Sequence, residues 1–445
     1  MGHYFGTDGI RASAEAEILQ PPFLKRLAKA AFAFAGGKSG LSIVIGRDPR
    51  TSGARIVDAL SEVWVGAGGR VLDCGIVPTP AIALAVKAAK ADLGVVVTAS
   101  HNPARDNGIK FFSGSGTKLS EADEARLEAL IDTVADLTPC EGGERQAHPA
   151  AKAYESFAIG QAAAGILQGK KIVLDCAHGA TAKTTPVVLR ALGAELILLG
   201  DAPDGKNINA GVGSEHPEVL AAKVLESGAD LGIAHDGDGD RVLFVDAAGV
   251  VVPGDAILAL IGQHMIREDL LKDKTLVATV MSNLGLDRSI EALGGRVLRT
   301  PVGDRQVFYK MLEGDFGFGG ESSGHFILRS HLETGDGLTA ALAFLKAWLA
   351  SGAPVSELAS SITLFPQKIV NLYVDEKKPF EAIPEFTEAL GKIEKELGTE
   401  GRILVRYSGT ENKVRLLAEA ESEALAQSTI ERLEKLVATH LVLTK

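Results

Sequence analysis

Short apolar runs alternate with longer amphipathic stretches along the chain. The runs are rich in Val, Ile and Leu and predict β-strands, and the stretches between them predict helices, several of which begin with Ser, Thr or Pro. The predicted strands are 41–48, 70–75, 92–100, 171–179, 194–200, 230–236, 275–282 and 402–408. The predicted helices are 52–67, 120–135, 184–193, 216–228, 255–270 and 336–351. This alternation is typical of stacked βα units and therefore of an α/β fold.

At 445 residues the chain is too long for one compact core, and a division into three or four domains of ~100–150 residues is expected. Residues 137–150 are polar, contain Gly and Pro, and predict a linker. A turn at 246–249 begins a third unit, and 364–368 introduces a fourth. The predicted domains are 1–148, 149–250, 251–366 and 367–445. The first three are rich in βα units and similar in size, which suggests that they are related.

Composition and charge exclude several classes of protein. A net charge of -11 argues against general nucleic-acid binding, which needs a basic surface. The three cysteines are too few and too scattered for a disulfide framework or a zinc site. The N-terminus lacks the features of a signal peptide, and no apolar run approaches the ~20 residues of a membrane span. We therefore expect a cytoplasmic protein with no membrane or nucleic-acid partner.

The most specific motif is an acidic turn that follows one predicted strand and precedes another. Asp236, Asp238 and Asp240 alternate with glycines and are followed by Arg241. Three carboxylates so close together would repel one another if buried without a cation, and glycines allow them to converge on one hard ion. A calcium EF-hand would need Gly at its sixth position and Glu at its twelfth, where this chain has Arg241 and Ala247. A Mg²⁺ site shared with a phosphate is favoured, and a solvated acidic turn is the alternative.

A second motif places a serine at the carboxyl end of a strand. Residues 98–103 read Thr-Ala-Ser-His-Asn-Pro, so that Ser100 lies where open α/β sheets bind ligands. Lys110 follows, beyond an Asn107–Gly108 pair that is predicted to turn the chain back. A hydroxyl nucleophile, an ammonium group and a metal site together suit a phosphoryl relay. The alternative is that Ser100 and Asn102 only cap a turn.

A third motif lies at residues 319–325 and contains the G-x-S-x-G pattern of serine hydrolases. That pattern requires a strand before the serine and a helix after it, but here a glycine-rich stretch precedes it and an extended one follows. A polar loop that binds sugar hydroxyls is a better interpretation. Glu321 would accept hydrogen bonds, Ser323 would donate and accept, and His325 would move a proton. A purely structural His325 is the alternative.

A fourth motif, at residues 406–412, combines arginine, two hydroxyl side chains and a glycine turn after a strand. Guanidinium groups and backbone amides are well suited to phosphate, and a plain surface turn is the alternative. The candidate phosphate-binding residues are Arg406, Ser408, Gly409, Thr410 and Arg415.

Two further segments, 6–11 and 46–50, are lesser candidates for anion binding, and a solvated loop charge is the alternative for Arg50. Nucleotide motifs are absent from the sequence. Residues 37–39 resemble the end of a P-loop, but the required earlier glycine is Phe32. Neither ATP nor NAD is therefore implied.

With these four motifs in this order, the chain resembles the α-D-phosphohexomutase superfamily over essentially its full length. The resemblance implies four domains around a central cleft: three similar mixed α/β sandwich domains and a smaller α+β C-terminal domain. The domains would carry, in chain order, the phosphoserine loop, the metal-binding loop, the sugar-recognition loop and the phosphate-binding loop. This division agrees with the one drawn from the chain's own pattern.

Other segments resemble the branch of the superfamily that acts on glucosamine phosphates. They are 4–11, 207–218, 280–286, 299–305 and 334–337. Three positions depart from the usual pattern of that branch: Ser322 stands where Gln is usual, Ala12 where Gly is common, and Asn412 where Pro is frequent. Ser322 bears most on specificity because it adjoins Glu321.

The resemblance also implies roles for individual residues. Ser100 would be phosphorylated, and one Mg²⁺ would be held against that phosphate by Ser100 and the three aspartates Asp236, Asp238 and Asp240. The implied catalytic residues are Ser100, Lys110, His101, Arg11 and His325. The implied substrate-binding residues are Arg241, Glu321, Ser323, Arg406, Ser408, Gly409, Thr410 and Arg415.

The implied reaction interconverts glucosamine 6-phosphate and glucosamine 1-phosphate through glucosamine 1,6-bisphosphate. The only expected partners are small sugar phosphates, and a homodimer is left open. Three other functions stay open from the sequence: a phosphomannomutase/phosphoglucomutase, a metal-dependent sugar phosphatase in which the phosphoserine is hydrolysed, and a non-catalytic sugar-phosphate binding protein.

Overall fold

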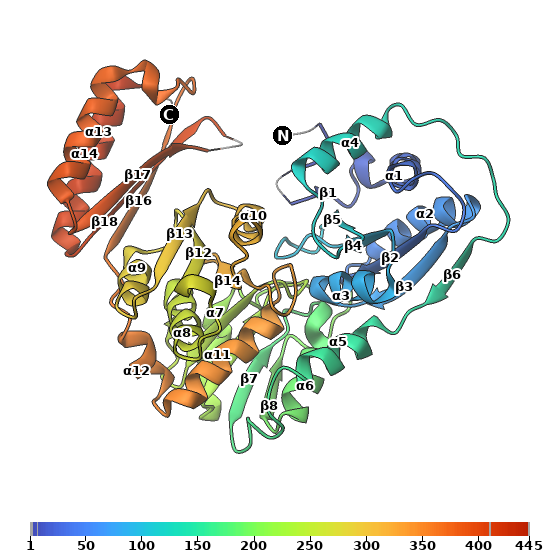
Figure 1. Cartoon of the computed structure of the whole chain (residues 1–445), viewed down its shortest axis with the longest axis horizontal. Helices are drawn as coiled ribbons and strands as arrows, with labels where there is room; N and C mark the ends of the chain where they lie inside the picture. Colours follow the sequence, from blue (N-terminus) through green and yellow to red (C-terminus); the bar gives the residue numbers. More distant parts are fainter. Residues whose placement is uncertain (1–2, 7, 409–410, 444–445) are drawn as a thin grey trace.

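The chain forms four β-sheets, each covered by helices, which follow one another along the sequence (Figure 1). The computed structural model describes residues 3–6, 8–408 and 411–443. In this part of the chain no helix is both long enough and apolar enough to cross a membrane. The predicted class, α/β with a smaller C-terminal α+β domain, is confirmed.

The first sheet has six strands in the order β1-β5-β4-β2-β3-β6. Its strands are β1 (Ile10–Ser13), β2 (Ser42–Arg47), β3 (Arg70–Ile76), β4 (Leu93–Val97), β5 (Asp106–Ser113) and β6 (Glu144–Ala147). Its helices are η1 (Glu17–Leu19), α1 (Pro21–Phe34), α2 (Gly53–Gly66), α3 (Thr79–Ala89) and α4 (Glu121–Ile131). Strand β6 lies inside the predicted linker 137–150 and extends the sheet beside β3.

The second sheet has the order β11-β10-β9-β7-β8. Its elements are α5 (Ala150–Ile159), β7 (Lys171–Asp175), η2 (Ala180–Lys183), α6 (Thr185–Ala191), β8 (Glu195–Leu199), α7 (Pro217–Ser227), β9 (Leu231–His235), β10 (Val242–Asp246) and β11 (Val251–Val252).

The third sheet has the order β13-β12-β14-β15. Its elements are α8 (Gly254–Arg267), η3 (Lys272–Lys274), β12 (Thr275–Thr279), α9 (Leu284–Glu291), β13 (Arg296–Thr300), α10 (Asp304–Gly314), β14 (Phe318–Gly320), β15 (Phe326–Leu328), α11 (Gly337–Ser351) and α12 (Val355–Ser360). The fourth, three-stranded sheet has the order β16-β18-β17, with β16 (Gln367–Tyr373), η4 (Phe380–Ala382), α13 (Pro384–Leu397), β17 (Gly401–Tyr407), β18 (Lys413–Ala420) and α14 (Glu423–His440).

The first three sheets contain the same four-stranded unit. In β3-β2-β4-β5, the strand that comes first in the chain lies between two parallel neighbours, and the fourth strand pairs antiparallel with the third. The same arrangement recurs in β8-β7-β9-β10 and in β13-β12-β14-β15. The predicted relation among the first three domains is therefore confirmed by their topology.

The repeated unit brings three of the predicted motifs to equivalent positions. Ser100 follows β4, the Asp236–Asp240 turn follows β9, and the Glu321–His325 turn follows β14. Each motif thus connects the third strand of a unit to the antiparallel fourth, at the carboxyl edge of the parallel strands. Ligands of open α/β sheets bind at this edge.

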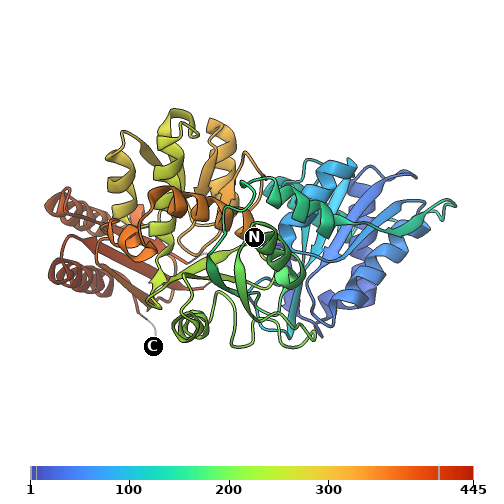
Figure 2. The same ribbon diagram turned by 90° about the horizontal axis from the view of Figure 1, so that it is seen from below.

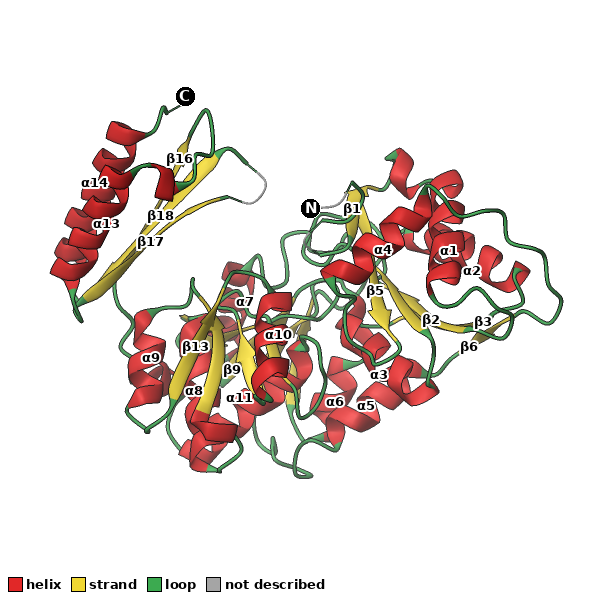
Figure 3. Cartoon of the chain, turned by 45° about the horizontal axis from the view of Figure 1, so that its top comes forward, coloured by secondary structure: helices red, strands yellow, loops and turns green. Residues whose placement is uncertain are grey.

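One apolar core is continuous through the first three domains, from Val44 in β2 to Ile362 beyond α12. A polar contact crosses the same region, because the buried hydroxyl of Tyr154 in α5 donates to Asp336 at 2.5 Å. The fourth domain has its own core around Phe386. Figures 2 and 3 show the four domains in sequence, with the C-terminal sheet and its two helices at one end.

The predicted turn at Asn107–Gly108 is wrong. Both residues are buried inside β5, where Gly108 pairs with Arg11 of β1. The chain turns earlier, where the amide of Asp106 donates to the carbonyl of Pro103. Glycine is needed in this strand because a Cβ at position 108 would lie 2.6 Å from the carbonyl oxygen of Ile10.

Candidate active site

Ser100 lies three residues beyond β4, which ends at Val97. Its φ of 51° lies in the left-handed region, which residues other than glycine seldom adopt. The amide of Ser100 donates to the hydroxyl of Thr98 at 2.9 Å. Its own hydroxyl donates to Oδ2 of Asp236 at 2.5 Å and lies 3.5 Å from Nδ1 of His101. The backbone thus turns the serine oxygen toward the acidic turn of the second domain.

The side chain of Arg50 holds the loop that carries Ser100 in place. It is wholly buried, and its Nε donates to Asp48 at 2.9 Å. Its Nη2 donates to the carbonyl oxygens of Ser100 and Asn102 at 3.0 and 2.7 Å. The solvated alternative for Arg50 is therefore wrong: the carbonyl groups of the serine loop converge on a buried guanidinium, which replaces water as their partner.

The three aspartates form a buried cluster whose oxygens, one from each residue, lie within 4.8 Å of one another. The solvated alternative is therefore wrong. Burial, and then the charges of Asp238 and Asp240, raise the pKa of Asp236 well above its usual value. Oδ1 of Asp238 and Oδ1 of Asp240 are buried and have no hydrogen-bond partner among the described residues. Orphaned oxygens in a crowded acidic turn fit a divalent cation with oxygen ligands.

Lys110 lies beneath this cluster on β5. Its Nζ is 3.1 Å from Asp238, 3.4 Å from Asp240 and 3.0 Å from Asp8. Burial lowers the pKa of Lys110, but the three carboxylates outweigh burial and raise it. Lys110 is therefore held as a cation, and the structure shows no hydrogen bond between it and Ser100 within the described segments.

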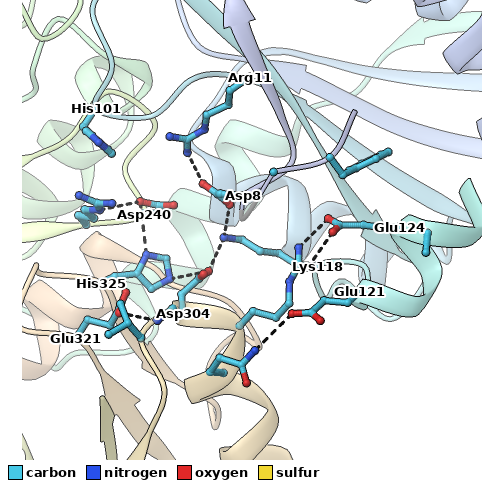
Figure 4. A pocket seen from close by; sticks show the side chains of 18 of the residues that line it. Asp8, Arg11, His101, Lys118, Glu121, Glu124, Asp240, Asp304, Glu321 and His325 are labelled. Atoms are coloured by element: carbon cyan, nitrogen blue, oxygen red, sulfur yellow. Dashed lines mark hydrogen bonds and ion pairs between the residues drawn. The ribbon is translucent and has the colours of Figure 1, made fainter. Parts of the chain in front are cut away.

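A cleft of about 790 Å³ opens beside these groups (Figure 4). Among the described residues, its walls come from the first three domains. It is lined by Phe5, Gly6, Asp8, Arg11, His101, Lys118, Glu121, Glu124, Ala125, Glu128, Asp240, Arg241, Val302, Gly303, Asp304, Arg305, Gln306, Glu321 and His325.

Arg11, His101 and Arg241, all predicted from the sequence, line the cleft from the first two domains. Arg11 forms an ion pair with Asp8. Arg241 approaches Asp240 at 4.0 Å, and its backbone amide donates to Asp236 at 3.2 Å. Burial, and then the charge of Arg241, lower the pKa of His101. His101 is thus a largely neutral imidazole next to the serine.

His325 and Glu321 line the cleft from the third domain. His325 is 4% exposed, with Nδ1 3.6 Å from Asp240 and Nε2 3.5 Å from Asp304. Burial lowers the pKa of His325, but these two carboxylates outweigh burial and raise it. Oε1 of Glu321 accepts a hydrogen bond from the amide of Gly303 at 3.0 Å, which fixes the carboxylate against the wall. Ser323, predicted to bind the sugar, and Ser322 are both exposed and do not line the cleft.

Seven charged residues that line the cleft were not identified as site residues from the sequence: Asp8, Lys118, Glu121, Glu124, Glu128, Asp304 and Arg305. Lys118 donates to Asp8 at 3.0 Å and to Asp304 at 2.5 Å, so it joins the first domain to the third. Nearby, Arg305 makes a two-pronged contact with Glu124, at 2.8 and 2.7 Å. Asp8 and Asp304 fall in the segments 4–11 and 299–305, but nothing in the sequence singles out Lys118.

The fourth domain contributes no described residue to the cleft walls. Arg406 and Arg415 lie opposite each other on β17 and β18, and the Nε of each is buried without a hydrogen-bond partner among the described residues. Burial, and then the charge of Arg415, lower the pKa of Arg406. Ser408 is 3% exposed, and Gly409 and Thr410 lie outside the described residues. Two unopposed guanidinium groups side by side suit an anionic ligand.

Comparison with known families agrees with the four-domain division. The phosphoglucomutase/phosphomannomutase models match in chain order: alpha/beta/alpha domain I at residues 2–137, domain II at 157–249, domain III at 253–365 and the C-terminal domain at 369–436.

Individual relatives extend over nearly the whole chain. A phosphoglucosamine mutase of Anaeromyxobacter sp. (strain Fw109-5) is 44% identical, covering 93% of this chain and 91% of the relative. One from Geotalea daltonii is 45% identical, covering 95% of each. A solved phosphoglucomutase/phosphomannomutase family protein from Burkholderia thailandensis has a TM-score of 0.83 at 23% identity, covering 99% of this chain and 98% of the other. The chain therefore belongs to the phosphoglucomutase/phosphomannomutase family.

Proposed function

We propose that this enzyme is an isomerase that interconverts glucosamine 6-phosphate and glucosamine 1-phosphate through a phosphoserine at Ser100. The observation that carries the proposal is the contact of 2.5 Å between the Ser100 hydroxyl and Asp236, in a turn whose three carboxylates converge. The names of the relatives over nearly the full chain support glucosamine phosphate as the substrate.

The residues of the acidic turn fit a single Mg²⁺, with Asp236, Asp238 and Asp240 as its protein ligands. A divalent cation there would neutralise charge on the phosphoryl group as it is transferred. Because a phosphoserine carries about -1.5 to -2 charges, the serine oxygen needs such a neighbour. Arg241 and Lys110, whose cationic groups adjoin the same carboxylates, add positive charge at this end of the cleft.

In the first half of the reaction, the 1-hydroxyl oxygen of glucosamine 6-phosphate attacks the phosphorus carried by Ser100. A new bond forms between that oxygen and phosphorus, the bond to the Ser100 oxygen breaks, and the serine oxygen regains the proton that the sugar hydroxyl loses. Lys110 on the serine side is the candidate donor of a proton, and His325 or Arg11 on the cleft side would assist. The product of this step is glucosamine 1,6-bisphosphate.

In the second half, the bisphosphate turns around in the cleft and returns its 6-phosphate to Ser100, so that glucosamine 1-phosphate leaves. One phosphate site must therefore hold either end of the intermediate. Arg406, Ser408 and Arg415, together with Gly409 and Thr410, are proposed to form it. Because Arg406, Ser408 and Arg415 do not line the cleft, the fourth domain must move toward the cleft during the reaction cycle.

The test combines mass spectrometry of the intact protein with kinetics of Ser100→Ala. We expect one phosphate on Ser100 in the active enzyme and a loss of at least about 10³-fold in mutase activity in the variant, because the proposed relay passes through this hydroxyl. Ser115→Ala, a serine outside the cleft, is the matched control and should retain activity. Mutase activity retained in Ser100→Ala would contradict the proposal.

The choice of substrate is tested with glucosamine, glucose and mannose phosphates side by side. Preference for either of the last two would support the phosphomannomutase/phosphoglucomutase alternative, and release of inorganic phosphate without isomerisation would support the phosphatase. The cytoplasmic location and the homodimer stay predictions.

A further inference from the structure

Two carboxylates of the third domain, Asp304 and Glu321, line the cleft. Asp304 pairs with Lys118, which also contacts Asp8, and its Oδ2 lies 3.5 Å from Nε2 of His325. Glu321 forms no ion pair with any described residue. Carboxylates that face an anionic ligand without full neutralisation would repel it unless the ligand brings a positive charge of its own.

Two oxygen atoms of this wall are free to accept hydrogen bonds. Oδ2 of Asp304 accepts from Lys118, and Oε1 of Glu321 accepts from the amide of Gly303, but the other oxygen of each carboxylate has no partner among the described residues. Gly303 precedes Asp304, so the contact from its amide ties the two acidic side chains to one segment of the wall. Both residues line the cleft (Figure 4).

A buried polar atom beside them is also without a partner. Nε2 of His325 makes no hydrogen bond with any described residue, although the side chain is 4% exposed and lines the cleft. This nitrogen lies 3.5 Å from Oδ2 of Asp304, the oxygen that also binds Lys118, so both groups approach one side of the carboxylate and leave Oδ1 of Asp304 for a polar group of the ligand.

We propose that Asp304 and Glu321 together bind the ammonium group of the amino sugar. Asp304 is thereby a specificity-determining residue. This inference rests on the proposed function. At neutral pH an amino sugar carries an ammonium group with three N–H donors, whereas glucose and mannose phosphates present a neutral hydroxyl at the same carbon. Two carboxylates bind a cation with three donors more strongly than they bind a hydroxyl, because the contacts are charge-assisted.

A structural role for Asp304 gives a different expectation. If its carboxylate only held Lys118 and His325 in place, its removal would disturb the cleft for every sugar alike. If it binds the ammonium, its removal affects the amino sugar selectively. The ratio of kcat/KM for two substrates separates these roles, because effects shared by both substrates cancel in the ratio.

The experiment measures kcat/KM of the Mg²⁺-loaded, Ser100-phosphorylated enzyme for glucosamine 6-phosphate and glucose 6-phosphate. In Asp304→Asn we expect the glucosamine-to-glucose ratio to fall by about 10-fold or more, as for a lost charged contact in a buried site. Glu313→Gln removes one carboxylate from the same helix, α10, at a residue outside the cleft, and should leave the ratio unchanged.

An unchanged ratio in Asp304→Asn would overturn the proposal, whatever happens to the absolute rates. Should that variant not fold, Glu321→Gln gives the same readout, and a ratio unchanged there would overturn it equally. A wild-type enzyme that turns over glucose 6-phosphate but not glucosamine 6-phosphate would instead refute the proposed function, and the amino-sugar specificity with it. The two failures are therefore distinct.

Discussion

At the scale of single residues, the cleft depends on backbone positions that leave room for functional side chains. Gly335 lies against the imidazole of His325, and a Cβ at that position would be 2.1 Å from Nε2. Gly237 plays the same part for the serine loop, since its Cβ would lie 2.6 Å from the carbonyl oxygen of Ser100. Glycine is required at these two places by the approach of a functional group.

Substitution of Gly335 by Ala should displace the His325 ring from the cleft. We expect kcat to fall by about 10-fold or more, because a group that moves a proton or contacts the sugar would lose its position. The measurement is steady-state kinetics together with circular dichroism. Gly391→Ala is the matched control: nothing lies within 4 Å of its Cβ, it is inside α13, and it should keep full activity and gain up to about 1 kcal/mol of stability. A fully active Gly335→Ala enzyme would show that His325 needs no fixed position.

At the scale of secondary-structure elements, the start of one helix, α11, connects two of the domains whose turns form the cleft. Asp336 caps α11 and accepts hydrogen bonds from the amides of Leu338 and Thr339. It also accepts from Tyr154 of α5, so that one buried carboxylate connects the second domain to the third. Burial raises the pKa of Asp336 to about 6, against the lowering effect of these hydrogen bonds.

The raised pKa predicts a pH dependence of stability. An unfolded Asp titrates near 3.9, so between about pH 4 and 6 the folded chain holds this proton more tightly than the unfolded chain does. The resulting stabilisation is present below about pH 4 and is lost as the pH rises through about 6, a change of about 3 kcal/mol at most. Asp336→Asn cannot titrate, so the melting temperature of the wild type relative to this variant should fall across that range in calorimetry.

The exposed Asp315 provides a control of opposite sign. The hydrogen bond from Arg329 lowers the pKa of Asp315. The melting temperature of the wild type relative to Asp315→Asn should therefore rise slightly with pH, and not fall. If the difference in melting temperature between the wild type and Asp336→Asn does not vary with pH, the assignment of the raised pKa to Asp336 is contradicted.

The elements and the acidic turn could be predicted from the sequence because each depends on local pattern. Predicted strands such as 41–48 and 230–236 differ from β2 and β9 by only a residue at each end. The turn predicted at Asn107–Gly108 was wrong because these residues pair with β1 instead, although the dipeptide favours turns. That pairing cannot be inferred from the spacing of residues in the sequence. Lys118 could not be found because its partner Asp304 lies 186 residues away, and only the folded chain brings the two together.

At the scale of the whole molecule, one apolar core runs through the first three domains, and the fourth keeps a core of its own. The fourth domain contacts the third through Arg402, whose Nη1 donates to the carbonyl oxygen of Val280 at 3.1 Å. Such polar contacts are weaker constraints than a continuous apolar core. Movement of the fourth domain against the other three is therefore the least costly change of shape.

Small-angle X-ray scattering tests this movement. Addition of glucose 1,6-bisphosphate with Mg²⁺ should reduce the radius of gyration of the wild type, because the proposed mechanism brings the guanidinium groups of Arg406 and Arg415 to the bound phosphate. The double variant Arg406→Ala, Arg415→Ala should bind weakly and keep the larger radius at the same ligand concentration. A wild-type radius that does not change under saturating ligand would contradict closure.

The repetition of one four-stranded unit has a consequence for how such enzymes diversify. Each unit carries one of the motifs on the turn between its third and fourth strands, while an apolar core runs through all three units. Under the proposed mechanism, replacing the residues of one turn alters one task, whether storage of the phosphoryl group, metal binding or choice of sugar, and leaves the other two turns on their own strands. Natural variation can therefore change the sugar by altering the third turn and its neighbour Asp304, with the phosphoryl-transfer apparatus inherited unaltered.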